Sequence, residues 1–400
     1  MYNSSMKLYN TLSRNVEEFV PLKPGTVGMY VCGITPYDTT HLGHAFTYLS
    51  FDVLVRFLES KGYKVTYSQN VTDINDRDND ILQRAKEQGV SWQKVADYWT
   101  KRFLQDMKAL NWRMPDNYLK ASEHMPTMIK LVSALLTKEY AYQAEGSVYL
   151  DVTKVKDFGK LSRHSKEKMI TVAKDFEEDL NNPRKKHPLD ITLWKAKEPN
   201  QPAHIPSFGS PFGKGRPGWH IECSSMAICS LSEQIDIHGG GIDLIFPHHE
   251  SEIAQSESAT GKIPFAKFWI HTHPVHYKGE KMSKSKGNLV LVSDLLEKYS
   301  PNAIRFLLLS HHYRKGFEYT KNELKKAEET VNVVRRAVSS GSNIKTNEPA
   351  FLTQFQHLLE NDLNTPDALT FIANNLQKID KPSLKKMLEI LGFDFKKNIL

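Results

Sequence analysis

Apolar residues near the start of the chain follow first strand-like and then helical spacing. Residues 27–32 (VGMYVC) form a short β-type run that ends at Gly33. After a turn, apolar residues recur at helical spacing from residue 41 to Gly62, and a β-branched and aromatic run follows at residues 64–70. Strand, helix and strand in this order predict a βαβ unit, whose ligand should lie beyond the carboxyl ends of the strands.

The remaining pattern predicts helices, an insertion, a second sheet half and further helices. Helical spacing dominates residues 79–138, whereas residues 144–194 are polar and mixed. The strand-like runs EQIDIHGG and FAKFWIHTH lie within residues 218–292. Helical spacing returns over residues 303–400, with breaks expected at Gly341-Ser342 and at Pro382.

We therefore predict an α/β fold. A Rossmann-like parallel-sheet nucleotide-binding domain should carry an inserted connective segment and be followed by a C-terminal helical bundle. The expected divisions are 1–115 for the first half of the sheet domain, 116–195 for the insertion, 196–300 for the second half and 301–400 for the bundle.

Composition narrows the class of protein. The net charge of +7 and the pI near 9.0 fit a polyanionic partner, and a lysine-rich proteome would explain them equally well. The three cysteines, Cys32, Cys223 and Cys229, are too few for a disulfide scaffold. No apolar run is long enough to span a bilayer, and the N-terminal residues lack an apolar signal core. We expect a cytoplasmic protein without membrane contact.

Two short motifs indicate a site for the phosphates of ATP. The string HLGH at residues 41–44 offers two imidazoles and backbone N–H groups at a helix start. The string KMSKS at residues 281–285 brings two ammonium groups and two hydroxyls to the same anion. The glycine run at 239–241 permits close backbone approach to the adenosine. We expect ATP contacts from His41, Gly43, His44, Gly240, Gly241, Lys281, Ser283 and Lys284, with His41, His44, Lys281 and Lys284 as the catalytic groups.

Four further residues form a candidate metal site. Cys32 ends the first strand, Cys223 lies near the start of a helical stretch, and His248 and Glu252 are four residues apart, so one helical face presents both. Two thiolates, an imidazole and a carboxylate suit zinc. Their spacing is not that of a zinc finger, so buried apolar cysteines beside an ordinary histidine are the alternative.

Longer strings resemble one known family. MYVCGITPYDTTHLGHA, NVTDIND, FGKLSR, PLDITLWK, GRPGWHIECSSM, DIHGGGIDLIFPHHESEIAQSE and KMSKSKGN occur in this order within residues 8–310. In these strings the chain resembles cysteinyl-tRNA synthetases, which are class I aminoacyl-tRNA synthetases, and the related mycothiol-pathway ligase that joins cysteine to an amino-sugar.

The resemblance implies that Cys32, Cys223, His248 and Glu252 hold zinc and that the thiolate of substrate cysteine becomes a further ligand. A zinc–thiolate bond discriminates against serine far better than an apolar pocket would. No separate editing domain is then needed.

The same resemblance implies roles for the residues around the amino acid. Trp219 would form an aromatic wall and Asp243 would pair with the substrate ammonium, whereas core packing and turn capping are their structural alternatives. The residues implied to line the amino-acid pocket are Gly33, Thr35 and Thr72.

The implied reaction has two steps. The cysteine carboxylate attacks the α-phosphorus of MgATP to give cysteinyl-adenylate and pyrophosphate, and the acyl group then passes to an acceptor. No side-chain nucleophile is required, so positioning and charge stabilisation carry the first step.

Two acceptors fit this reaction. CGITPYD, HLGHA and the lack of an obvious anticodon-reading domain after the bundle favour the amine of glucosaminyl-inositol. Glu252, His238 and the basic pI favour the terminal ribose hydroxyl of cysteine tRNA, which is our prediction, in a monomeric enzyme. A catalytically silent paralogue that binds cysteine or RNA is a third hypothesis, against which the intact motifs argue.

Overall fold

A five-stranded parallel sheet forms the centre of the molecule. The computed structural model describes residues 6–282, 286–339 and 349–395, so Ser283 and Lys284 lie outside the described residues. The sheet has the strand order β11-β10-β3-β4-β5. Its strands are β3 (Thr26–Ile34), β4 (Lys64–Val71), β5 (Asn117–Lys120), β10 (Ile235–Gly241) and β11 (Ala266–Thr272).

The predicted βαβ unit is present as β3, α1 (Leu42–Ser60) and β4. From β3 the chain crosses through α1 to β4 on one side, while β10 pairs in parallel with β3 on its other side. The strand order therefore reverses at β3, and the carboxyl ends of β3 and β10 flank the point where parallel α/β sheets bind ligands. The Rossmann-like fold class is confirmed.

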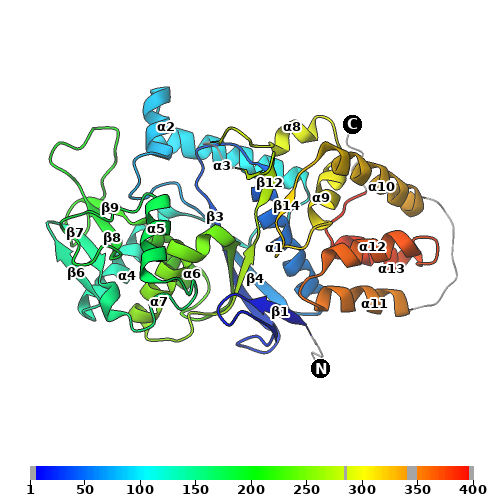
Figure 1. Cartoon of the computed structure of the whole chain (residues 1–400), viewed down its shortest axis with the longest axis horizontal. Helices are drawn as coiled ribbons and strands as arrows, with labels where there is room; N and C mark the ends of the chain where they lie inside the picture. The colour runs from blue at the N-terminus through cyan, green and yellow to red at the C-terminus, as the bar shows by residue number, and fades with distance from the viewer. Residues whose placement is uncertain (1–5, 283–285, 340–348, 396–400) are drawn as a thin grey trace.

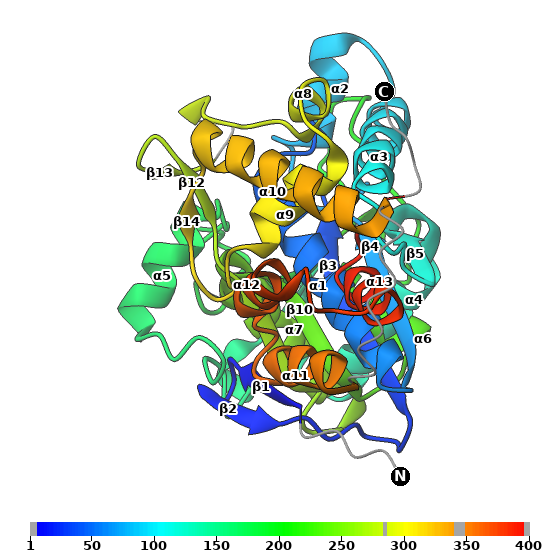
Figure 2. The same ribbon diagram turned by 90° about the vertical axis from the view of Figure 1, so that its right-hand side faces the viewer.

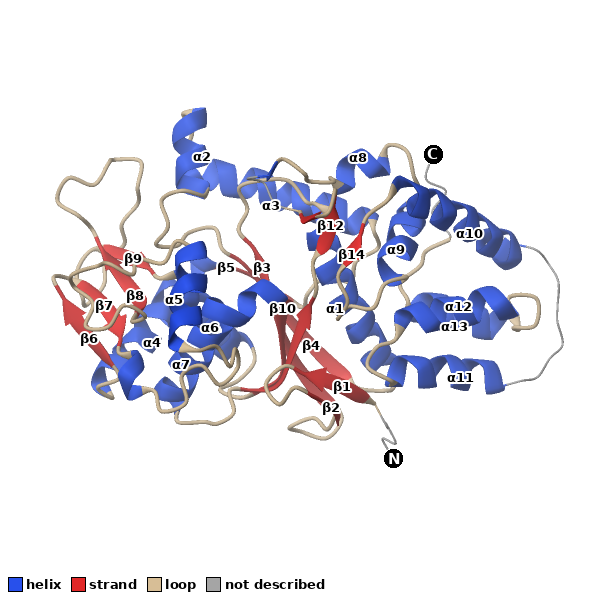
Figure 3. Ribbon diagram, viewed as in Figure 1, coloured by secondary structure: helices blue, strands red, loops and turns tan. Residues whose placement is uncertain are grey.

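The inserted segment carries its own antiparallel sheet, which lies beside the central sheet (Figure 3). Its order is β6-β7-β8-β9, built from β6 (Ala141–Ala144), β7 (Ser147–Leu150), β8 (Ile191–Ala196) and β9 (Gly215–Pro217). The helices of this part of the molecule are the short η1 (Ala121–His124), α4 (Met125–Thr137), η2 (Val152–Lys154), α5 (Lys166–Asp175), α6 (Trp219–Ser230), the short η3 (Ile242–Leu244) and η4 (Ile245–His249), and α7 (Glu250–Thr260).

Helices gather at the opposite end of the molecule from the antiparallel sheet (Figure 1). They are α9 (Pro301–Leu309), α10 (Lys321–Ser339), α11 (Pro349–Glu360), α12 (Thr365–Asn375) and α13 (Lys381–Ile390), with α10 lying above the other C-terminal helices in Figure 2. The break expected at Pro382 is present: α12 ends at Asn375, and Pro382 occupies the first turn of α13, where a missing N–H costs nothing. The other expected break, at Gly341-Ser342, lies outside the described residues.

The smaller elements complete the described chain. They are β1 (Lys7–Asn10), β2 (Asn15–Glu18), α2 (Ile81–Gln88), α3 (Trp92–Ala109), β12 (Val275–Tyr277), β13 (Glu280–Lys281), α8 (Val292–Leu296) and β14 (Phe317–Glu318). No helix among the described residues combines the length and apolarity needed to cross a bilayer.

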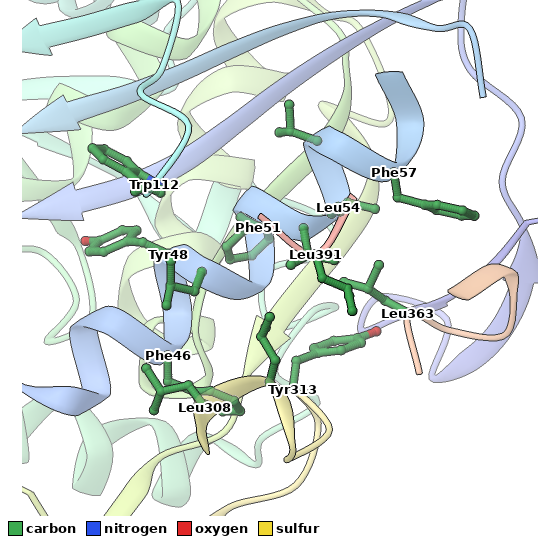
Figure 4. Packing of buried hydrophobic residues seen from close by; sticks show 14 of the residues in the cluster. Phe46, Tyr48, Phe51, Leu54, Phe57, Trp112, Leu308, Tyr313, Leu363 and Leu391 are labelled. Atoms are coloured by element: carbon green, nitrogen blue, oxygen red, sulfur yellow. The ribbon is translucent and has the colours of Figure 1, made fainter. Parts of the chain in front are cut away.

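Helix α1 ties the sheet to the bundle. Phe46 and Leu54 project from this helix toward Leu308 and Leu391, which come from the C-terminal part of the chain (Figure 4), while the Phe51 ring packs against Gly239 of β10. All of these side chains are almost fully buried in one cluster that also contains residues of β3 and β4. The C-terminal helices and the central parallel sheet therefore pack on one hydrophobic core, so the loss of packing in one part should also destabilise the other.

Candidate active site

A cavity of about 390 Å³ opens at the carboxyl ends of β3 and β10. Its position is the one expected for a ligand at the reversal point of the sheet. The predicted site residues that line it are Cys32, Gly33, Thr35, His41, Gly43, His44, Trp219, Gly241, Asp243 and Lys281. Thr72 and Gly240 lie next to the lining rather than in it: the Thr72 hydroxyl accepts a hydrogen bond from the Asn70 amide at 3.0 Å, and Gly240 packs closely against His249.

The histidine turn forms the start of α1. His41 caps the helix, because its Nδ1 accepts a hydrogen bond from the Gly43 N–H at 3.0 Å. The His41 and His44 rings stack with their centroids 3.8 Å apart. Burial lowers the pKa of both rings, that of His44 to about 4, so both are neutral at pH 7. With Nδ1 accepting, the proton of His41 lies on Nε2, which makes this ring a hydrogen-bond donor at a helix N-terminus.

Lys281 stands across the cavity from this turn. Its ammonium is 2.8 Å from the Asp243 carboxylate, and both side chains are about half exposed. The amide of Asn288 donates to the Lys281 carbonyl at 3.2 Å and fixes the backbone beside the loop. The structure thus places the first lysine of the KMSKS motif against the carboxylate that was expected to receive the substrate ammonium.

The four candidate metal ligands converge. The donor atoms of Cys32, Cys223, His248 and Glu252 all lie within 4.8 Å of one another, and all four residues are buried. Glu252 Oε1 is 3.5 Å from Cys32 Sγ and 3.3 Å from His248 Nε2. Strand β3, helix α6 and the η4–α7 segment each contribute ligands, so residues far apart in sequence meet at one point.

A second set of donors shares two of these ligands. His238 and His249 also lie within 4.8 Å of Cys32 and Glu252. His238 Nε2, however, already contacts Glu252 Oε2 at 2.9 Å, and His249 Nδ1 contacts His271 Nε2 at 2.8 Å. His238 therefore supports the carboxylate through Oε2, whereas His249 Nε2 lies 3.9 Å from Glu252 Oε1 and its ring borders the donor cluster.

The ionisable groups of this cluster are of the kind that a bound cation stabilises in their charged forms. Burial raises the pKa of both thiols, Cys32 and Cys223, and of the Glu252 carboxyl, and it lowers the pKa of His248. Deprotonated donors would be uncompensated anions in an apolar core. A divalent cation reverses that balance and holds thiolates and a carboxylate in their charged forms, so the donor set fits a metal.

Comparisons with known proteins agree with this geometry. Residues 18–329 match the family model for the catalytic domain of class I tRNA synthetases (C). A cysteine–tRNA ligase of Dehalococcoides mccartyi is 46% identical over 92% of this chain and 79% of its own length. The chain belongs to the cysteine–tRNA ligase family. Two further relatives carry the same name. The one from Legionella pneumophila is 44% identical over 97% of this chain and 85% of its own length, and the one from Thermococcus onnurineus is 43% identical over 96% of this chain and 84% of its own length.

Solved structures of other class I synthetases share the fold. A methionyl-tRNA synthetase of Mycobacterium tuberculosis in complex with methionyl-adenylate superposes with a TM-score of 0.63, at 15% identity, over 92% of this chain and 89% of its own. An arginyl-tRNA synthetase from Campylobacter jejuni, also 15% identical, gives a TM-score of 0.56 over 92% and 91%. At such identity the likeness concerns the arrangement of elements.

In this member of the cysteine–tRNA ligase family, Trp219 forms a wall of the cavity directly beside the metal donors. Its ring stacks on that of His248 with the centroids 4.4 Å apart, and its backbone N–H donates to Asp76 Oδ1 at 3.0 Å. Sequence reasoning missed the inner histidines His249 and His271. The signal for His249 was the pair of adjacent histidines in PHHESE, where one had already been assigned as a ligand, and His271 lies in the strand-like run FAKFWIHTH.

Proposed function

We propose that this protein activates L-cysteine with MgATP and transfers the cysteinyl group to the terminal ribose hydroxyl of cysteine tRNA. One observation carries the proposal. Four donors typical of a zinc site converge, and one of them, Cys32, lines a cavity whose walls also hold the histidine turn and Lys281. A site for sulfur and a site for phosphate thus share one space.

Zinc is the metal that suits Cys32, Cys223, His248 and Glu252. When bound, it supplies a soft Lewis-acid position that prefers a thiolate to a serine hydroxyl. The chain itself orients the rest of the amino acid. Trp219 closes one side of the pocket, and Asp243 takes the substrate ammonium. The amino-acid pocket further includes Gly33, Thr35 and Thr72.

The first step needs positioning and charge neutralisation. One carboxylate oxygen of cysteine attacks the α-phosphorus, the bond from that phosphorus to the α,β-bridging oxygen breaks, and pyrophosphate leaves with the electron pair. His41 and His44 donate hydrogen bonds to the phosphates as neutral rings, and Lys281 neutralises the leaving group. Gly43 offers its backbone N–H to the phosphates, and Gly240 and Gly241 lie near the adenosine. Ser283 and Lys284, the other assigned residues of the KMSKS motif, contact the ATP phosphates in this proposal.

In the second step a ribose hydroxyl of the tRNA attacks the carbonyl carbon of the adenylate, loses its proton, and AMP leaves. The net charge of +7 favours a polyanionic acceptor. The relatives named above are cysteine–tRNA ligases, so the amino-sugar acceptor is not favoured. The protein acts as a monomer in this proposal.

Pyrophosphate exchange followed by acceptor choice tests the reaction. The protein should exchange labelled pyrophosphate into ATP with L-cysteine and scarcely at all with L-serine. Labelled cysteine should then pass to transcribed cysteine tRNA, more slowly as salt is raised, and not to glucosaminyl-inositol. Transfer to glucosaminyl-inositol alone would overturn the choice of acceptor, and absence of exchange would favour the silent paralogue.

Two cysteine variants test the metal assignment, one inside the donor cluster and one outside it. Cys223→Ser should lose at least about 100-fold in zinc affinity, more than the about 10- to 100-fold typical of outer residues, because it removes a ligand. Cysteine binding should fall with it. Cys229→Ser changes a cysteine of the same helix that lies outside the cluster and should keep both. Zinc competition with a chromogenic chelator measures the first effect and equilibrium binding of cysteine the second.

A further inference from the structure

Glu178 follows α5 in the inserted segment and reaches toward the metal donors from outside the cavity. Its Oε1 lies 3.3 Å from His220 Nε2 and 3.3 Å from Arg77 Nη2. The Arg77 guanidinium beside this oxygen favours the charged carboxylate, which can only accept hydrogen bonds.

A chain of contacts joins this carboxylate to the ligand histidine. His248 Nε2 faces Glu252 Oε1 at 3.3 Å inside the donor cluster, so a metal ligand at this position needs its proton on Nδ1. His220 Nδ1 lies 2.8 Å from that atom and is placed to accept its hydrogen bond. His220 Nε2 then donates to Glu178 at 3.3 Å, so the carboxylate holds the ring in the orientation that this tautomer of His248 requires.

The second partner of Glu178 acts on the aromatic wall. The Arg77 guanidinium lies over the Trp219 ring, 4.1 Å from its centroid. His248 stacks on the same ring at 4.4 Å, and two groups this close cannot share one face, so Trp219 is held between them. One carboxylate oxygen thus controls both the ligand histidine and the wall beside it.

We propose that Glu178, supplied by the insertion, is a positioning residue for thiol recognition: through His220 it presents Nε2 of His248 to the metal, and through Arg77 it holds Trp219 over the cysteine pocket. This inference rests on the proposed zinc site and deepens it. The insertion then has a role in amino-acid selection in addition to its place in the fold. Neither role requires contact between Glu178 and the substrate.

The test compares Glu178→Ala and Glu178→Gln with Asp175→Asn, which removes an exposed carboxylate of the same segment. Glu178→Ala should lose about 10- to 100-fold in zinc affinity, the usual effect of removing an outer partner of a ligand histidine. Glu178→Gln keeps an oxygen that can accept from His220 and should lose less. Chelator competition with zinc alone gives this readout without any activity measurement.

Kinetics separate positioning from damage to the fold. In zinc-saturated protein, Glu178→Ala should raise KM for cysteine about tenfold and leave KM for ATP and the unfolding midpoint unchanged. Zinc affinity and cysteine KM equal to those of Asp175→Asn would overturn the role of Glu178. If Cys223→Ser also bound zinc normally, the metal site itself would be wrong and both proposals would fall. If Cys223→Ser lost zinc while the Glu178 variants bound it normally, the proposed function would stand and only the positioning role of Glu178 would be contradicted.

Discussion

Lys281 occupies the place that the proposed reaction needs for the substrate. Its ammonium pairs with Asp243, which should receive the ammonium of cysteine, so the amino acid must displace the lysine. Once displaced, Lys281 is free to meet the triphosphate. Lys281 thus competes with cysteine for Asp243 and also assists the triphosphate. Its removal should therefore not weaken the binding of cysteine, whereas it should slow the formation of the adenylate.

We expect Lys281→Met to slow pyrophosphate exchange by about 100-fold or more, the range found when one charge-stabilising donor is lost. Cysteine affinity without ATP should not weaken, because Asp243 is freed of its competitor. Exchange rates and equilibrium dialysis of cysteine measure the two effects. The control is Lys286→Met, since Lys286 pairs with Glu280 at 2.8 Å and does not line the cavity. Equal loss of binding and rate would argue for a structural role of Lys281.

At the level of single residues, the sequence predicted those side chains that belong to recognisable motifs. The four metal donors were identified through the resemblance, since their spacing alone left buried apolar cysteines as an alternative. The supporting contacts, such as Glu178 to His220 and His249 to His271, could not be predicted. They depend on the orientation of rings from segments far apart in the chain, and no spacing rule encodes that orientation.

Among the elements, β3 and β4 pass unusually close at Gly33. A Cβ at this position would lie 1.6 Å from the Asn70 carbonyl oxygen, which is backbone and cannot turn aside. The Gly33 N–H also donates to the Asn70 side-chain oxygen at 2.7 Å. A glycine is thus required where β3 opens into the cavity.

Gly33→Ala should part the carboxyl ends of the two strands. We expect it to lower the free energy of unfolding by about 1–3 kcal/mol or more, as overpacking does, and to weaken cysteine binding. Gly28→Ala is the matched control in the same strand, because its nearest neighbour would be an ordinary contact at 3.7 Å. Urea unfolding of both variants checks the difference. Similar stability for the two would show that the strands yield easily.

The elements that sequence reasoning found are long or strongly periodic. The β3–α1–β4 unit, β10 and β11 each extend over seven residues or more. Strands β5, β6 and β7 have four residues each, too few to show alternation, and all were missed. As a result, the pairing of β5 with β4 carries the parallel sheet beyond residue 115, into the range predicted for the insertion.

At the scale of the whole molecule, one buried ion pair joins the bundle to the sheet domain. Arg305 of α9 contacts Asp52 of α1, and both side chains are fully buried. The guanidinium also donates to the Leu391 carbonyl at 2.6 Å and the Leu110 carbonyl at 2.9 Å. Helix α9, helix α13 and the end of α3 are thus fastened to α1 by a single side chain.

Removal of this side chain should be costly because it strands the charge of Asp52. We expect Arg305→Met to lower the free energy of unfolding by about 3–5 kcal/mol, and Arg305→Met with Asp52→Asn to recover part of that loss. Lys385→Met is the control: its ammonium is 3.8 Å from Glu389 and both side chains are more than half exposed, so its loss should cost at most about 1 kcal/mol. Urea unfolding followed by circular dichroism measures all of these variants. A cost for Arg305→Met no larger than that for Lys385→Met would mean that apolar packing against α1, rather than the ion pair, holds the bundle in place.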